Sequence, residues 1–230
     1  MTSVEFSEWS RISRSGGIVP IADELAQLAA ETKGFLPPDE AAALHDAAIA
    51  AGAGVWLEIG TYCGKSTVYL GGAAQTVGAQ LITVDHHYGS EENQPGWVWH
   101  DKTLVDPQSG RLDTLPSLRR TLRLAGLESV VTPVVGDTAV VARWWSTPLA
   151  FLFLDGNHTE AVAQHDYESF AQHVVLGGVL AVHDVFPDPA DGGQPPWHVV
   201  QRAVSSGVFE QESVTGSLRV LRRVGSQPID

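Results

Sequence analysis

The most constraining feature of the sequence is a regular alternation of short apolar runs with longer amphipathic stretches between residues 55 and 182. Each apolar run has the length of a buried β-strand, and each amphipathic stretch has the apolar spacing of a helix. Strands that alternate with helices in this way predict βαβ units, and therefore a parallel sheet with helices on both faces. The predicted strands are Val55–Ile59, Leu81–Val84, Val130–Val135, Ala150–Leu154 and Val179–Val182, and the predicted helices are Lys65–Gln75, Leu115–Leu124, Thr138–Trp144 and Thr159–Val174.

The two ends of the chain depart from this alternation. Near the N-terminus, Ile18–Ala30 and Pro38–Ala51 are rich in Ala, Leu and Glu and predict two helices ahead of the first strand. Near the C-terminus, Val208–Val214 and Ser217–Val224 flank a Thr-Gly turn, which predicts an antiparallel hairpin. A parallel sheet that closes with an antiparallel hairpin is a narrow subset of α/β folds.

The domain organisation follows from these patterns. We expect a Rossmann-like α/β domain over residues 55–230, built on a mostly parallel seven-stranded sheet, and a helical extension over residues 1–54 that serves as a lid or a dimer contact. One insertion, residues 86–114, is long, polar and punctuated by Pro and Gly, yet carries two tryptophans and a tyrosine. Such loops are usually functional lids or disordered. The aromatic residues favour a lid over the alternative, a solvated surface loop.

Composition and charge limit the classes of function. The 230 residues, 43% of them hydrophobic, suffice for one substantial core. The net charge of −13, with no basic stripe beyond Arg119, Arg120 and Arg123, argues against a nucleic-acid partner. The N-terminus does not resemble a signal peptide, and no apolar run approaches the about 18 residues of a membrane span. The single cysteine excludes an internal disulfide. From these features together we expect a cytoplasmic protein without a membrane partner.

A glycine-containing loop, E58-I-G-T-Y-C-G-K-S-T67, follows the first predicted strand and suggests a ligand close to the backbone. A phosphate-binding P-loop needs four residues between its glycines, whereas Gly60 and Gly64 are separated by three. The apolar run Phe151–Leu154 followed by Asp155 would pass for a Walker-B strand. A P-loop-like phosphohydrolase therefore stays an alternative, which the short glycine spacing opposes.

Acidic residues at the strand ends favour a different ligand. In a doubly wound sheet the ligand lies across the carboxyl ends of the strands, and an acid ending the second strand, here Asp85, is placed to bind ribose hydroxyls. Gly136-Asp137-Thr138, which closes the third strand, would line the same crevice. The predicted cofactor contacts are Glu58, Gly60, Tyr62, Gly64, Ser66, Asp85, His86, Gly136, Asp137, Thr138 and Asp155.

These motifs, taken in order, resemble the class I S-adenosylmethionine-dependent methyltransferases. The resemblance covers residues 55–224 and includes Gly177-Gly178 before the fifth strand as well as the terminal hairpin, which is typical of that fold. The family loop often has a glycine where Tyr62 stands, and the spelling found here is common in the branch that resembles small-molecule and sugar O-methyltransferases. The resemblance implies S-adenosylmethionine as cofactor and a small-molecule hydroxyl as acceptor.

Polar residues after the fourth and fifth strands indicate where the chemistry occurs. D155-G-N-H158 follows the fourth strand and H183-D184 follows the fifth, and both strand ends project into the same crevice. Carboxylates with a histidine can bind a divalent cation such as magnesium, so Asp155, His183 and Asp184 are the predicted metal ligands. In the competing interpretation, Asp155 only caps the following helix and His183 is a hydrogen-bonded strand-end residue.

The predicted catalytic residues are Asp155 and His158. A metal-bound acceptor hydroxyl has a lowered pKa, and histidine has an ordinary pKa that suits a general base, which favours His158 with His86 and His87 as competitors. The arrangement resembles the metal-dependent O-methyltransferases of catechol and sugar types. By that resemblance Asp155 matches the first metal ligand, His183-Asp184 matches the acidic or amide pair after the fifth strand, and His158 matches the basic residue of the catechol type. A histidine at position 183 departs from the family and leaves the metal open.

The acceptor is suggested by resemblance alone. The lid sequence H86-H-Y-G-S-E-E-N93 with H183-D184 resembles actinobacterial sugar O-methyltransferases, which implies a sugar acceptor such as a methylated mannoside. A phenolic, catechol-type acceptor is the alternative. A non-methylating protein of the same fold, with iron at Asp155 and His183, is a further one. A homodimer is compatible with the sequence, which does not decide it.

Overall fold

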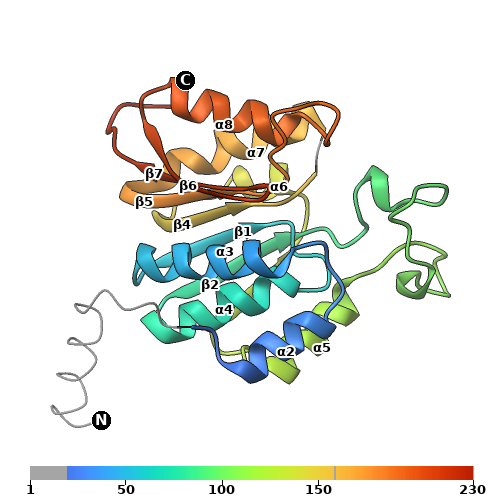
Figure 1. Ribbon diagram of the computed structural model, residues 1–230. Coiled ribbons are helices and arrows are strands. Elements are labelled where there is room, and N and C mark those ends of the chain that lie inside the picture. Colours follow the sequence, from blue (N-terminus) through green and yellow to red (C-terminus); the bar gives the residue numbers. More distant parts are fainter. Residues whose placement is uncertain (1–19, 158, 230) are drawn as a thin grey trace, which may run out of the picture.

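The computed structural model describes residues 20–157 and 159–229. Its seven-stranded sheet has the order β3-β2-β1-β4-β5-β7-β6 (Figure 1). Strands β1 to β5 pair in parallel, whereas β7 runs antiparallel to both β5 and β6. The predicted α/β fold with a terminal antiparallel hairpin is therefore confirmed. The strands are β1 (Val55–Ile59), β2 (Gln80–Asp85), β3 (Val131–Val135), β4 (Leu149–Leu154), β5 (Val174–Val182), β6 (Phe209–Thr215) and β7 (Leu218–Arg223).

Helices cover both faces of the sheet and enclose two hydrophobic cores. One core is covered by α2 (Asp23–Glu31), α3 (Pro38–Ala51), α4 (Lys65–Val77) and α5 (Leu115–Ala125), and the other by α6 (Thr138–Ala142), α7 (Glu160–Phe170) and α8 (Pro195–Ser205). Strand β1 serves both cores, because neighbouring side chains of a strand point to opposite faces: Trp56 packs into the first and Leu57 into the second.

The helix α3 belongs to the main core, although the sequence places it in an extension. Its residues Ala41, Leu44 and Ala48 are fully or almost fully buried and pack with Trp56 of β1. The first predicted helix, Ile18–Ala30, corresponds to α2, which starts later, at Asp23. Residues 18 and 19 lie outside the described part of the chain. Residues 38–51 are therefore structurally continuous with the α/β domain.

Two elements differ from the sequence prediction. Helix α8 was not expected: it opens on Pro195-Pro196, which suits the first turn of a helix because proline lacks only a donor that is unpaired there. Strand β5 begins at Val174, whereas the pattern predicts helix up to that residue. Gly177 (φ +79°) and Gly178 interrupt the apolar run, which explains why the early part of this strand escapes detection. The pairing of β5 with β4 also shifts register between Leu149 and Phe151.

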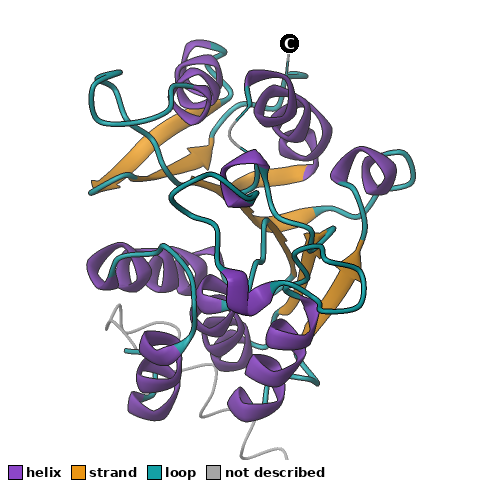
Figure 2. Cartoon of the chain, turned by 90° about the vertical axis from the view of Figure 1, so that its right-hand side faces the viewer, coloured by secondary structure: helices purple, strands orange, loops and turns teal. Residues whose placement is uncertain are grey.

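The segment 86–114, called the lid segment below, projects beyond the carboxyl end of β2 and lies at the right in Figure 1. It contains two short 3-10 helices, η1 (Glu91–Asn93) and η2 (Lys102–Leu104), and it is viewed from that side in Figure 2. A small cluster formed by Leu104, Leu112 and Cys63 anchors it to the glycine loop. A third 3-10 helix, η3 (Ala171–His173), extends α7.

Within residues 20–157 and 159–229, no helix is both long and apolar enough to cross a membrane.

Gly60 allows β1 to end directly against β4. Its φ is +88°, and a Cβ atom at this position would lie 2.0 Å from the main-chain oxygen of Asp155. The hydrogen bond from Asp155 N to Ile59 O (2.9 Å) joins the ends of β4 and β1, and the bond from Gly60 N to Val84 O (3.0 Å) joins the end of β1 to β2 on the other side. Only glycine fits this position, because any side chain would push the ends of two parallel strands apart.

The variant Gly60→Ala tests this constraint. We expect it to lower the free energy of unfolding by about 2–5 kcal/mol, because a left-handed backbone costs about 1–2 kcal/mol and overpacking adds to it. Gly78→Ala is the matched control, since Gly78 has φ +73° but open space around its missing Cβ. Urea unfolding of both variants measures the difference. Equal losses would contradict a role for the strand contact.

Candidate active site

A cleft of about 1100 Å³ lies at the carboxyl ends of the parallel strands. It is bounded by the glycine loop after β1, the ends of β2 to β5, the lid segment and the chain between α2 and α3. Most of the predicted site residues meet here, as expected for the carboxyl edge of a doubly wound sheet. The predicted residues along its wall are Gly60, Tyr62, Ser66, Asp85, His86, Gly136, Asp137, Thr138, Asp155, His183 and Asp184.

Asp85 organises the glycine loop. Its Oδ2 accepts hydrogen bonds from the main-chain N–H groups of Thr61 (3.0 Å) and Tyr62 (2.8 Å), and its Oδ1 accepts one from His87 (2.6 Å). The side chain of Asp85 is 15% exposed, so the carboxylate retains a face toward the cleft. An acid at the end of the second strand thus both shapes the loop and remains accessible to a ligand hydroxyl.

Tyr62 adopts a left-handed backbone conformation, with φ +50°. A non-glycine residue rarely does so, and such strain concentrates at functional sites. This is the position where the resembling family often has glycine, so the tyrosine keeps the glycine-like backbone and adds a ring. That ring lies 5.7 Å from the ring of Phe35, centroid to centroid. The departure from the family pattern therefore changes the wall of the cleft and preserves the turn.

Glu58 and Gly64 do not line the cleft. Glu58 is fully buried, and its two carboxylate oxygens accept hydrogen bonds from the hydroxyl groups of Ser66 (2.6 Å) and Thr67 (2.8 Å) at the start of α4. Burial raises the pKa of Glu58 to about 7, although the two hydroxyl groups oppose the shift. Gly64 precedes α4 with φ +92°. These residues hold the loop, and direct contact with a cofactor stays a prediction for both.

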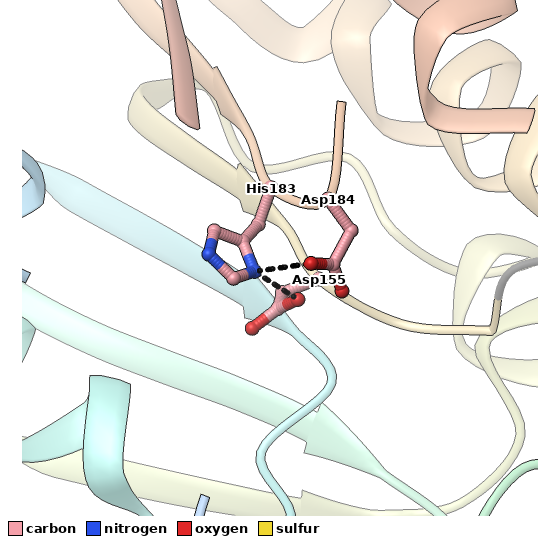
Figure 3. Close-up of side chains that lie close together, drawn as sticks. All are labelled: Asp155, His183 and Asp184. Carbon is pink, nitrogen blue, oxygen red and sulfur yellow. Dashed lines mark hydrogen bonds and ion pairs between the residues drawn. The ribbon is translucent and has the colours of Figure 1, made fainter. Parts of the chain in front are cut away.

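Asp155, His183 and Asp184 form a cluster on the cleft wall (Figure 3). The Nδ1 atom of His183 lies 3.1 Å from Asp155 Oδ1 and 3.5 Å from Asp184 Oδ1. Asp184 has a left-handed φ of +54°, directly after β5. The cluster arises because β4 and β5 are neighbours in the sheet and end at the same level, as Leu154 pairs with Val182.

The other ring nitrogen of His183 is bonded to a residue that the sequence analysis missed. Glu40 of α3 accepts a hydrogen bond from His183 Nε2 at 2.6 Å, and it also accepts from the N–H (2.7 Å) and hydroxyl (3.0 Å) of Ser217. Burial by itself lowers the pKa of His183, but Asp155 and Asp184 outweigh it and raise the pKa to about 11. His183 is therefore a cation that donates through both nitrogens.

The donor set suits a divalent cation in part. The ligand atoms of Asp155, His183 and Asp184 lie within 4.8 Å of one another. The carboxylate oxygens of Asp155 and Asp184 are hard ligands of the kind that magnesium or manganese takes, often with one or two carboxylates and several waters. His183 faces Asp155 with Nδ1 and Glu40 with Nε2, and its role as a ligand stays a prediction. The two carboxylates supply the hard oxygen ligands of the predicted three-residue set.

The histidines predicted as general bases differ in their surroundings. His158 lies outside the described residues. His86 lines the cleft, with its side chain 40% exposed and stacked on Tyr88. His87 is buried, and its Nδ1 is hydrogen-bonded to the Thr114 hydroxyl at 2.7 Å. Burial lowers the pKa of His87, and its role as a competing base stays a prediction.

Lys33 and Phe35, which the sequence analysis missed, join the chain after α2 to the lid segment along the cleft wall. Lys33 is bonded to Asp101 and Thr103, and the ring of Phe35 lies edge-on to the ring of Trp99 at 5.0 Å. Both rings are more than half exposed. An aromatic residue in the short loop Lys33–Pro37 was the available signal, but its partner lies 64 residues away in the sequence, since 99 − 35 = 64.

The cleft wall is strongly acidic. The permanently cationic side chains along the lining that the structure describes are Lys33 and Lys65, and Lys33 is engaged by Asp101. A wall of this charge favours neutral or cationic ligands and disfavours phosphorylated ones. The carboxylates of the wall are Glu40, Asp85, Glu92, Asp137, Asp155, Asp166, Asp184 and Asp191.

The strand order, the glycine loop and the acid ending β2 define a Rossmann-like methyltransferase fold. The profile of a family described as a methyltransferase domain matches residues 57–185, more than half of the chain. The chain therefore belongs to the methyltransferase-domain family. Glu40 and Ser217, which bond His183, lie outside the matched segment.

Solved structures agree on the fold. The O-methyltransferase NovP is 16% identical with a TM-score of 0.64, and the match covers 84% of each chain. An O-methyltransferase from Bacillus cereus, in complex with SAH, is 16% identical with a TM-score of 0.61 over 94% of this chain and 99% of that one. The O-methyltransferase TomG from Streptomyces achromogenes, in complex with SAM, is 17% identical with a TM-score of 0.57 over 98% and 100%.

The titration of Glu58 gives a testable pH dependence. Its folded pKa of about 7 exceeds the ordinary value of 4.5, so the folded state binds more protons and loses stability as pH rises through that window. We expect the wild type to lose up to about 3 kcal/mol between pH 4.5 and pH 8 relative to Glu58→Gln, which cannot titrate. Urea unfolding at both pH values measures this difference. A wild type and variant with parallel pH profiles would show that Glu58 titrates normally.

Proposed function

We propose that the protein is an S-adenosylmethionine-dependent O-methyltransferase that acts on a small-molecule hydroxyl group. The observation that carries the proposal is the meeting of two half-sites in one cleft: the glycine loop with Asp85, and the carboxylates of Asp155 and Asp184. Membership of the methyltransferase-domain family supports the reaction class. The names of NovP, TomG and the Bacillus cereus protein, each called an O-methyltransferase, support oxygen as the acceptor atom.

The residues around the glycine loop fit S-adenosylmethionine. Gly60 carries no Cβ, so the backbone itself forms the wall of the cleft, and the N-terminus of α4 begins just beyond it at Lys65. Asp85 would accept hydrogen bonds from ribose hydroxyls, and Asp137 and Thr138 would line the adenine side. When bound, the cofactor supplies an electrophilic methyl group. The acidic wall also suits its positive charge.

Asp155 and Asp184 are the proposed acceptor-side residues. A magnesium ion held by these two carboxylates would lower the pKa of the acceptor hydroxyl. The His183 imidazolium donates to Asp155 and partly neutralises the negative charge of the two carboxylates. His158, three residues after Asp155, is the proposed general base, with the exposed His86 as its competitor.

A sugar is the acceptor that we favour. The exposed rings of Phe35 and Trp99 at the mouth of the cleft offer flat apolar faces for a pyranose ring, and the carboxylates offer acceptors for its hydroxyl groups. A methylated mannoside remains one example of that class, and a phenolic ring would use the same walls. Trp197 of α8 does not line the cleft and packs against the second hydrophobic core. A homodimer is retained as a proposal that light scattering would test.

Calorimetric titration with S-adenosylhomocysteine tests the donor half. We expect binding both with magnesium and with EDTA, because all the predicted donor contacts except Asp155 lie outside the carboxylate pair. Asp85→Asn should weaken binding by about tenfold or more, since a hydrogen bond to a charged group contributes about 1.5–3 kcal/mol. Glu128→Gln, which alters an exposed carboxylate outside the cleft, is the control. An absence of binding by the wild type in both buffers would contradict the proposal.

A screen of sugar and phenolic acceptors, with detection of released S-adenosylhomocysteine, tests the acceptor half. We expect turnover to fall on addition of EDTA and to return with magnesium. Trp99→Ala should raise the acceptor KM about two- to tenfold through lost ring stacking. Trp144→Ala is the matched control, because that tryptophan is similarly exposed but lies outside the cleft. Full turnover in EDTA would exclude the metal, and equal KM values for the two variants would exclude Trp99 as an acceptor contact.

A further inference from the structure

We propose that Glu40 is a positioning residue of the active site, which acts on Asp155 through the ring of His183. The inference rests on the proposed function for its catalytic meaning and on the hydrogen bonds of Glu40 for its geometry. Glu40 lies on α3, outside the segment that matches the methyltransferase-domain family. The family motifs therefore do not predict it.

The contacts form one continuous chain from α3 to the cleft. Glu40 Oε2 accepts from His183 Nε2 at 2.6 Å, and His183 Nδ1 donates to Asp155 Oδ1 at 3.1 Å. An imidazole ring has one plane and two nitrogens, so fixing Nε2 also fixes the direction of the Nδ1–H bond. Glu40 thereby determines which oxygen of Asp155 is occupied by His183 and which is left for the cleft.

The position of Glu40 is itself closely defined. Its side chain is 5% exposed, and its carboxylate accepts from the Ser217 N–H at 2.7 Å and the Ser217 hydroxyl at 3.0 Å. A Cβ atom on Gly216, whose φ is +52°, would lie 2.0 Å from Glu40 Oε1. The turn between β6 and β7 is therefore shaped around this carboxylate. Helix α3, the end of β5 and the terminal hairpin meet at one buried group.

The packing of α3 does not need a carboxylate. A buried carboxylate is costly unless it is fully hydrogen-bonded, and replacement by a well-packed apolar residue is often neutral for stability. Glu40 also lines the cleft. Its presence at the junction of three elements is better explained by a demand of the site than by the stability of the helix. A purely structural role would leave the Nδ1–H bond of His183 unchanged when Glu40 is altered.

Nuclear magnetic resonance of the histidine ring N–H groups tests this directly. In the wild type we expect two exchange-protected ring signals from His183, assigned by their loss in His183→Asn. Glu40→Ala should expose both N–H groups to exchange with water, because the freed ring no longer holds its angle toward Asp155. Glu40→Gln keeps one oxygen acceptor and should restore the Nδ1–H signal at least in part. Asp39→Asn, an exposed carboxyl on the same helical turn, should match the wild type.

Binding and turnover complete the test. All variants should bind S-adenosylhomocysteine within about twofold of the wild type, which checks that they fold. With an acceptor from the screen, Glu40→Ala should lower kcat by about 10- to 100-fold, the range found for residues that orient a ligand or catalytic group, at unchanged KM for S-adenosylmethionine. A protected Nδ1–H signal in Glu40→Ala would overturn the inference, as would an unchanged kcat. Failure of the wild type to bind S-adenosylhomocysteine would instead refute the proposed function, while the ring signals would still decide the role of Glu40.

Discussion

The contact between the ends of β1 and β4 is the constraint on which the candidate site depends. Because Gly60 has no side chain, the main chain at the end of β1 lies so close to the main chain of Asp155 that a Cβ atom on residue 60 would clash with it. The glycine loop and Asp85 lie on one side of this contact, and the cluster of Asp155, His183 and Asp184 lies on the other. A ligand that spans the two half-sites can do so only because these strand ends are so close. The cleft is thus a consequence of backbone packing.

Charge is the second organising factor. Carboxylates from β2, β3, β4 and β5 collect at one edge of the sheet, because parallel strands present their ends together. Such a group is unfavourable unless a cation or hydrogen-bond donors compensate it. Main-chain N–H groups do this for Asp85, and the His183 imidazolium does it for Asp155 and Glu40.

The strand ends and their motifs were predictable because they depend on local patterns. Four- to six-residue apolar runs located β1 to β4 to within about a residue, and Asp85 and Asp155 were found because each directly follows such a run. The early part of β5 and helix α8 were not, since Gly177 breaks the apolar pattern of one and a proline pair obscures the start of the other. Glu58 was predicted from its position at the end of the first strand, but nothing local in the sequence showed that its carboxylate is buried and hydrogen-bonded to Ser66 and Thr67.

The sequence by itself determined the fold class, the family resemblance and the strand ends that carry polar groups, because hydrophobic periodicity and turn chemistry are properties of neighbouring residues. Only the tertiary structure decided which partners those groups take. Glu40 and His183 are 143 residues apart in the sequence, and no local pattern pairs them. The same holds for Phe35 and Trp99. These contacts depend on how α3 and the lid segment pack against the sheet, which is a property of the whole core.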